Sequence, residues 1–470
     1  MQLFVKDKGF YSRLLAIAVP ITLQGLINFG VNMADTVMLG RLGEVSLSAA
    51  SLANQFCFLF MILNFGLAGG AGVLTGQFWG KGDRESIAKT LSIVYRITAS
   101  LATLFFFACQ FFSTSIMGLY TTNPEVIALG GQYLRILSWA FLLQGISTVS
   151  AIVLRTVGIV RLTLVTALIT LANNVFMNWM LIFGNLGAPA MGVAGAAVAT
   201  AVSRLLEFTI IVVFLLRIDK KIRFRLRSLL RLDRPILRDY IHNGLPVLIS
   251  DAFLAVGMNI SSAIIGHLGA SFVAGSAITG VVWQLMTVLL MGIAAASSVI
   301  VGNTVGERRY EDAQRYGVTF LAMSVIVGLI AATGLYLLRN VAPTLYNVAG
   351  DTRLLAAEIM AATGVVSAFS SVNMMLTKGV LRAGGDTRFL MLADVLFLWA
   401  VSLPVGYVVA LVLHAPPWLV IFALRMDEVI KAVWCVKRLL SRRWIKNVTI
   451  GVGEVSDEAG QQEILPEAAE

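Results

Sequence analysis

A few acidic, amide and hydroxyl side chains lie inside the long apolar stretches that make up most of this chain. Asp35 lies in the first stretch, Asn174 and Asn178 in the fifth, and Thr200 in the sixth. Carboxylate, amide and hydroxyl oxygens suit a hard cation such as Na⁺, and a carboxyl group removed from water can also take up a proton. The four residues therefore indicate a site for Na⁺ or H⁺, with a purely structural hydrogen-bonded cluster as the alternative.

Other ionisable residues lie in later apolar stretches, where a charge is costly and marks a functional candidate. Asp251 and Asp394 are candidates for binding a cationic substrate or a proton, and interhelical hydrogen bonding is the equal alternative. Opposite charges three or four residues apart share a helix face and can pair. Structural or gating pairs of this kind are expected at Arg204 with Glu207, Arg425 with Glu428, and Asp427 with Lys431.

The composition indicates an integral membrane protein. Of the 470 residues 58% are hydrophobic and only 13% are charged, against about 25% charged in soluble proteins. The three cysteines and three histidines are scattered, and neither metal-spaced acids nor a phosphate-binding loop occurs. This pattern predicts neither an enzyme nor an ATPase, and no resident cofactor or metal beyond a Na⁺ at Asp35.

The apolar stretches predict twelve membrane-spanning helices, since a span needs about 20 mostly apolar residues. They lie at 12–39, 48–78, 90–118, 127–155, 162–184, 191–217, 240–266, 275–304, 313–339, 354–381, 388–413 and 417–438. With twelve spans both chain ends share a side, and the loops of that side hold most lysines and arginines, including the basic run at 220–234. The positive-inside rule places that side in the cytoplasm and favours a loop over a nucleic-acid site.

The chain is a duplication. Shifted by 226 residues, Pro20 falls on Pro246 and Gly40 on Gly266. Two halves of equal topology around a midplane cavity are typical of alternating-access transporters. The prediction is an N-lobe at 1–217, a basic cytoplasmic linker at 218–239, a C-lobe at 240–440, and a polar cytoplasmic tail at 441–470 that is disordered from about 451.

The depth of the polar residues places them in two layers. At about 1.5 Å per residue, Asp35 and Asn178 lie roughly 9 Å below the outer ends of their helices, and Asn174 and Thr200 roughly 14–15 Å below. All four are therefore expected in the outer half of the N-lobe. Asp251 and Asp394 are expected in the inner half of the C-lobe, because both follow the cytoplasmic starts of their helices.

Several motifs in order give the chain a family resemblance. Pro20 precedes Asp35 by fifteen residues, Gly40-Arg41-Leu42-Gly43 follows, and further motifs are Leu154-Arg155 with Gly158, the small-residue run 192–200, and Leu381-Arg382-Ala383-Gly384-Gly385-Asp386-Thr387. Over about residues 10–440 the chain resembles the multidrug and toxic compound extrusion (MATE) family of bacterial type. The resemblance implies an all-α, V-shaped pair of six-helix lobes in the plasma membrane. It also implies a monomer among membrane lipids that exports organic cations, driven by inward Na⁺ or H⁺.

The resemblance also assigns the N-lobe residues. Asp35, Asn174, Asn178 and Thr200 match the positions of the family's N-lobe cation site. This chain has Asn178 where some members have a second aspartate, which leaves the choice between Na⁺ and H⁺ open. One subfamily carries a glutamate in helix 7 and an aspartate in helix 10. Here helix 10 has serines at 370 and 371 in that region, so that site is not reproduced.

Two other functions compete with export of cations. A flippase of lipid-linked oligosaccharides or peptidoglycan precursors, from the same superfamily, should carry extra spans or basic cavity residues that hold phosphate. The N-lobe candidates are acidic or neutral, which favours cationic cargo. A membrane enzyme acting on lipid-linked substrates would need a nucleophile or metal constellation, and the sequence offers none.

Overall fold

The computed structural model describes residues 4–230, 233–346 and 348–449, which are helical or in loops. The predicted disordered part of the tail lies outside these residues. The first half of the chain forms α1 (Lys8–Gly40), α2 (Glu44–Lys81), α3 (Arg84–Gly118), α4 (Pro124–Thr156), α5 (Arg161–Phe183), and α6 (Val193–Val213) with its extension η2 (Phe214–Ile218). Short η1 (Asn185–Gly187) and η3 (Leu226–Leu230) lie in the connections.

The second half repeats the pattern with more interruptions. It forms α7 (Arg234–Gly266), α8 (Ala270–Gly306), α9 (Tyr310–Leu338), η4 (Ala342–Leu345), α10 (Gly350–Met375), η5 (Leu376–Val380), α11 (Leu381–Ala383), α12 (Thr387–Phe397), η6 (Leu398–Ser402), α13 (Leu403–Tyr407), η7 (Val408–Val412), α14 (Pro417–Leu424) and α15 (Met426–Leu440). Three of the interruptions, η5, η6 and η7, are single π-helical turns, which often occur at functional positions in helices.

The predicted spans are confirmed as helices, with one difference. Among the described residues eleven helices are long and apolar enough to cross a membrane. The twelfth predicted span is broken at Arg425 (φ −122°, ψ 18°) into α14 and α15. A new helix start leaves backbone N–H groups without intrahelical partners. The hydroxyl of Ser402 accepts one of them, from Asp427, at 2.6 Å.

Local sequence explains where several helices begin. The side chains of Asp7, Asp83 and Asp233 accept hydrogen bonds from backbone N–H groups at the starts of α1, α3 and α7. Such N-caps stabilise a helix by about 1 kcal/mol. Two helices end at glycines in the left-handed region, α2 at Gly82 (φ 80°) and α5 at Gly184 (φ 75°), where a side chain would be strained.

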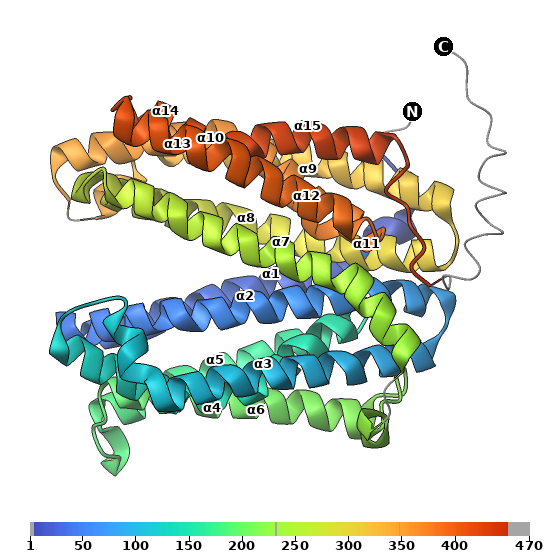
Figure 1. The fold of residues 1–470 in the computed structure, drawn as a ribbon, viewed down its shortest axis with the longest axis horizontal. Coiled ribbons are helices and arrows are strands. Elements are labelled where there is room, and N and C mark those ends of the chain that lie inside the picture. Colours follow the sequence, from blue (N-terminus) through green and yellow to red (C-terminus); the bar gives the residue numbers. More distant parts are fainter. Residues whose placement is uncertain (1–3, 231–232, 347, 450–470) are drawn as a thin grey trace.

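The helices form two lobes that lie one above the other in Figure 1, with α1 and α2 facing α7 and α8 between them. At one end, the first helix of each lobe packs against the other lobe: α1 contacts α8, and α7 contacts α2. Phe10 of α1 stacks on Tyr316 of the C-lobe at 4.7 Å between ring centres, and the hydroxyl of Tyr240 of α7 donates to the Leu67 carbonyl of the N-lobe at 2.9 Å. Each lobe therefore supplies part of the other's hydrophobic core.

The lobes touch closely at that end and separate at the other. A side chain at Gly70 would collide with the backbone of Gly244, and one at Gly306 with the backbone of Gln77. In contrast, a Cβ at Gly40 or Gly266, near the far ends of α1 and α7, would have no neighbouring atom within 4 Å. The lobes are therefore in close contact at one end of the molecule, while these two glycines at the other end border open space.

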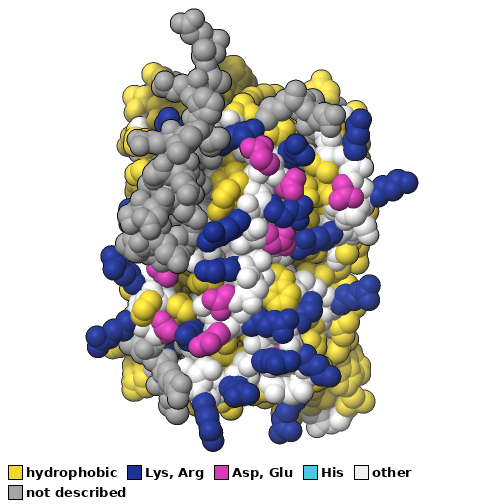
Figure 2. Space-filling model, turned by 90° about the vertical axis from the view of Figure 1, so that its right-hand side faces the viewer, with side chains coloured by type: hydrophobic (Ala, Val, Ile, Leu, Met, Phe, Trp, Pro, Cys, Tyr) yellow, Lys and Arg dark blue, Asp and Glu magenta, His cyan; other side chains and the backbone are white. Residues whose placement is uncertain are grey.

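The end at which the lobes are in close contact carries the basic loops, and we call it the basic face. Figure 2 shows lysines and arginines spread over it, with a smaller group of acidic side chains among them. They include the basic residues of 217–227 and 234–238 and the arginine at 388. Both ends of the described chain lie on this side of the molecule (Figure 1).

The first nine residues of the predicted tail, 441–449, pack against both lobes. The Trp444 side chain is fully buried and donates to Gln314 at 2.8 Å. Gln77, at the end of α2, accepts from the Val448 N–H at 2.8 Å and donates to the Lys446 carbonyl at 3.1 Å. We call residues 441–449 the bridging segment, because it joins the C-lobe to the N-lobe across the basic face.

Candidate functional site

Three of the four predicted N-lobe residues come together between α1 and α5. The Nδ2 group of Asn178 donates to the carboxylate of Asp35 and, at 3.1 Å, to Oδ1 of Asn174. Both asparagines are buried and Asp35 is half-buried. The two asparagines are four residues apart, so they share one helix face. Thr200 is half-buried on the neighbouring α6 and makes no hydrogen bond to the other three within the described residues.

The Asn178 amide leaves one polar atom unused. Its Oδ1 is buried and has no hydrogen-bond donor among the described residues. An unsatisfied buried acceptor of this kind costs about 1–3 kcal/mol. The amide as placed suits an ionised Asp35, because its N–H group faces the carboxylate. Turned over, it would present oxygen to Asp35, which suits a proton or a Na⁺ held between the two oxygens.

Two arginines and a glutamate also lie on the N-lobe helices α4 and α6. Arg204 and Glu207 form the predicted pair on α6, with Nη1 and Oε2 2.7 Å apart. Arg155 of α4 donates to Gln24 of α1 at 2.7 Å. With Asp35 ionised, two acids (Asp35 and Glu207) stand against two arginines (Arg155 and Arg204). A bound proton or Na⁺ at Asp35 would leave a net positive charge.

In the C-lobe, Asp251 is held by two basic side chains. Lys378 of η5 and Arg382 of α11 both bind its carboxylate, Arg382 with Nη2 at 3.0 Å from Oδ1. The side chains of Arg382 and Asp251 are 11% and 12% exposed, so the pair is largely removed from water. The carboxylate is therefore not free to bind a cation in this conformation, and the ion pairs join α7 to the helix that contains η5.

Asp394 belongs to a second, deeper cluster. Its carboxylate lies 3.2 Å from Lys431 Nζ and accepts from the Ser250 hydroxyl at 2.6 Å. Lys431 also lies 3.8 Å from Asp427, the predicted i,i+4 pair, and 3.9 Å from Glu428. One buried lysine thus faces three carboxylates, and the cluster joins α7, α12 and α15.

The expected pair of Arg425 with Glu428 is not formed within the described residues. Glu428 accepts from the side chain of Asn373 at 2.5 Å instead. The reason is the helix break, because Arg425 stands at the junction of α14 and α15 rather than one turn before Glu428 in a continuous helix.

Sequence reasoning missed three basic partners in the C-lobe. Lys378 lies in an apolar stretch, where a lysine has the same claim to attention as an aspartate. The repeat aligns Arg382 with Arg155, so the sequence offered a signal by which Arg382 could have been singled out. The contact of Lys431 with Asp394 joins separate helices, and no spacing along the sequence signals it.

Known proteins share this architecture. A curated relative, probable multidrug resistance protein NorM of Rhizobium meliloti (strain 1021), is 27% identical over 401 residues, which cover 84% of each chain. Two solved structures have the same fold. One is a multidrug resistance MATE family transporter in an outward-facing conformation (TM-score 0.82, 18% identity, covering 93% of this chain and 99% of that one). The other is a MOP superfamily transporter from Pyrococcus furiosus (TM-score 0.82, 17% identity, covering 94% and 100%).

Fold and buried charges together define a multi-pass helical membrane protein of two repeated lobes. The sequence matches the MatE family over residues 20–180 and 246–408, one match in each lobe. The chain belongs to this family, the multidrug and toxic compound extrusion transporters, and is of the bacterial type. The predicted resemblance and the all-α, twelve-helix, two-lobed fold are thereby confirmed.

Proposed function

We propose that this chain is a secondary active antiporter that exports small cationic organic compounds in exchange for Na⁺ or H⁺. The observation that carries the proposal is the hydrogen-bonded chain of Asp35, Asn178 and Asn174, which holds one carboxylate at the boundary of α1 and α5. A related protein with this fold is named as a probable multidrug resistance protein, which supports small-molecule cargo.

The charge on Asp35 couples binding of the driving ion to binding of the cargo. With Asp35 ionised, Asp35 and Glu207 together balance Arg155 and Arg204, and a cationic compound can enter. A proton or Na⁺ at Asp35 cancels that charge and permits the Asn178 amide to turn over, because its buried Oδ1 then gains a partner. The site becomes net positive and the cationic compound is released. An ion drives transport only through such a difference in affinity between two states.

The arrangement of the two lobes supports release of the cargo on the outer side of the membrane. We place the basic face in the cytoplasm by the positive-inside rule, so the close contacts between the lobes lie on the cytoplasmic side and the far ends of α1 and α7 face outward. Return to an inward-open state would require the lobes to separate at the basic face. The contacts of Phe10 with Tyr316 and of Gln77 with the bridging segment would break in that step.

The C-lobe clusters serve this cycle as fixed supports. Asp251 and Asp394 are each neutralised by a basic partner, which suits a lobe that moves as one body. The same pairing leaves Lys378, Arg382 and Arg204 less available to the phosphate-bearing cargo of a flippase, whereas Arg155 binds only the neutral Gln24. Lys378 and Arg382 already bind Asp251, and Arg204 already binds Glu207.

The test uses purified protein in vesicles with a fluorescent organic cation as cargo. Na⁺ and H⁺ gradients are imposed separately, and efflux is followed for each. Transport that accelerates with one gradient and stops when that gradient is collapsed supports antiport and identifies the ion. Cargo movement that is independent of both gradients, or movement of a lipid-linked oligosaccharide across the membrane instead, contradicts the proposal.

A further inference from the structure

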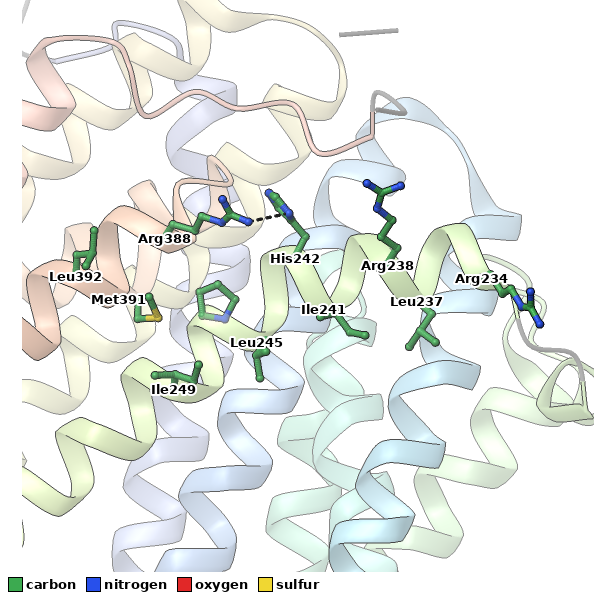
Figure 3. A pocket seen from close by; sticks show the side chains of 11 residues that line it. Arg234, Leu237, Arg238, Ile241, His242, Leu245, Ile249, Arg388, Met391 and Leu392 are labelled. Carbon is green, nitrogen blue, oxygen red and sulfur yellow. Dashed lines mark hydrogen bonds between the residues drawn. The ribbon is translucent and has the colours of Figure 1, made fainter. Parts of the chain in front are cut away.

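A recess on the outer surface of the C-lobe lies away from the Asp35 site. It has a volume of about 630 Å³ and lies between α7 and α12 near the basic face. Figure 3 shows the side chains of both helices that line it. Pro246 lines the recess from inside α7. A proline inside a helix leaves one backbone carbonyl without its usual hydrogen bond.

The rim of the recess is cationic. Arg234, Arg238 and Arg388 are exposed and line the recess one after another, from Arg234 at the start of α7 to Arg388 beside His242 (Figure 3). None of the three forms an ion pair with a carboxylate in the described ranges, and Arg388 donates to the ring of His242 at 3.0 Å. Two acids are adjacent to these arginines in sequence: Asp233 pairs with Lys89 at 3.0 Å, and Asp239 is half-buried. The rim is therefore net positive and its guanidinium groups have free donors.

The floor of the recess is apolar and continues away from the rim. Leu237, Ile241, Leu245 and Ile249 are spaced four residues apart, so they form one stripe along α7. Ile241 and Leu245 are 49% and 44% exposed. From Arg238 to Ile249 the stripe runs roughly 16 Å at about 1.5 Å per residue. That is about half of a hydrocarbon core of about 30 Å, hence the depth of one leaflet.

We propose that this recess is a binding site for an anionic phospholipid. The arginines of the rim attract the phosphate group, and an acyl chain lies along the α7 stripe beside Met391 and Leu392. Basic pockets between membrane helices on the cytoplasmic side bind anionic headgroups in general, and arginine provides several donors in a planar fork for phosphate. A free phosphate would satisfy the rim and leave the stripe uncovered, so the joint presence of both features favours a lipid.

The chain contains one competing occupant. Residues 451–470 hold six acidic side chains and no basic one. Such a segment complements the charge of the rim, but it offers few side chains that could cover a stripe one leaflet deep. The experiment must therefore separate a lipid from free phosphate and from this acidic segment.

The experiment measures lipid binding to the purified full-length protein in detergent by native mass spectrometry. Phosphatidylglycerol and phosphatidylcholine with identical acyl chains are supplied in equal amounts. The test variant is R234Q/R238Q/R388Q. The matched control is K8Q/K437Q/R443Q, which removes the same charge from exposed residues of the basic face that have no ion pair in the described ranges. Leu245→Ser tests the apolar stripe.

Wild-type protein should retain phosphatidylglycerol in preference to phosphatidylcholine. An attraction of about 1 kcal/mol per arginine corresponds to about five-fold in affinity. The triple variant should therefore lose on the order of a hundred-fold, and Arg388→Gln alone about five-fold if the triple variant fails to fold. The control should stay within about two-fold of wild type, and Leu245→Ser should weaken binding of the lipid.

Four results would overturn the proposal. They are equal retention of the two lipids, equal losses in the test and control triples, displacement of the lipid by inorganic phosphate at equal concentration, and unchanged binding in Leu245→Ser. A further arm replaces the six acids of 451–470 by their amides in the full-length chain. Phosphatidylglycerol affinity should not change there, and a ten-fold rise would identify the acidic segment as the occupant instead.

Discussion

Lys431 faces three carboxylates, which makes its removal a sharp test of the C-lobe cluster. In Lys431→Met the length of the side chain is kept and the charge is lost, leaving Asp394, 1% exposed, without its cation. At an effective dielectric constant of about 20, an attraction across 4 Å is worth roughly 4 kcal/mol before the cost of desolvation. Breaking a buried pair from one side costs about 3–5 kcal/mol.

The matched variant is Asp427→Asn, which removes the more distant acid at 3.8 Å and keeps Lys431 beside Asp394. It should cost about 1 kcal/mol or less, because it also relieves repulsion between neighbouring acids. The double variant Lys431→Met with Asp394→Asn should be more stable than Lys431→Met alone, because no buried charge is then left unpaired at their contact.

The assay is unfolding of the purified protein by denaturant in detergent, followed by tryptophan fluorescence and by gel filtration. The expected order of stability is wild type, Asp427→Asn, the double variant, then Lys431→Met. If Lys431→Met unfolds at the wild-type midpoint, the cluster does not hold α7, α12 and α15 together, and its acids remain candidates for transport.

Three further predictions concern orientation, the bridging segment and cargo. Tags placed after Glu44 and within 222–230 should report opposite sides of the membrane, the latter cytoplasmic, and labelling on one side would contradict the span count. Gln77→Ala should loosen the bridging segment and increase the inward-open population, measured as a longer spin-label distance between the lobes at the basic face. An unchanged distance distribution would mean that the segment does not restrain the lobes. Asp251→Asn leaves Lys378 and Arg382 without a counter-charge, so it and Asp394→Asn should weaken binding of cationic cargo while the ion dependence of efflux is kept. Normal transport of every tested cation by both variants would show that the charges left unpaired in these clusters do not act on the cargo.

The sequence predicted the helices well because long apolar stretches and the repeat of 226 residues leave few alternatives. It also placed Asp35 and Asn178 at equal depth, and the structure joins them by a hydrogen bond. Depth follows from position along a helix, at about 1.5 Å per residue. For Thr200 the depth in the membrane did not predict its contacts. Whether its side chain reaches Asp35 and the asparagines also depends on the rotation of α6 about its axis.

The C-lobe contacts could not be predicted in the same way. The partners Asp394 and Lys431 lie on α12 and α15, and their meeting depends on helix tilt and on the break at Arg425. Nothing in the local composition signals that break, since the predicted span is continuously apolar up to that residue. The bridging segment was missed for a related reason. Polar residues after a last span resemble a tail, and only tertiary contacts of Trp444 reveal that they pack.

The coupling role of Asp35 is tested most directly by Asp35→Asn, which keeps size and hydrogen bonding and removes the charge. The measurement is efflux of a fluorescent cation driven by Na⁺ or H⁺ gradients, with purified protein that elutes as a folded species in vesicles. Asn at this half-buried position is cheaper to bury than an ion, so the variant should fold. It should nevertheless lose gradient-driven efflux, because the driving ion no longer distinguishes the two states. Efflux at the wild-type rate would contradict the mechanism proposed for Asp35.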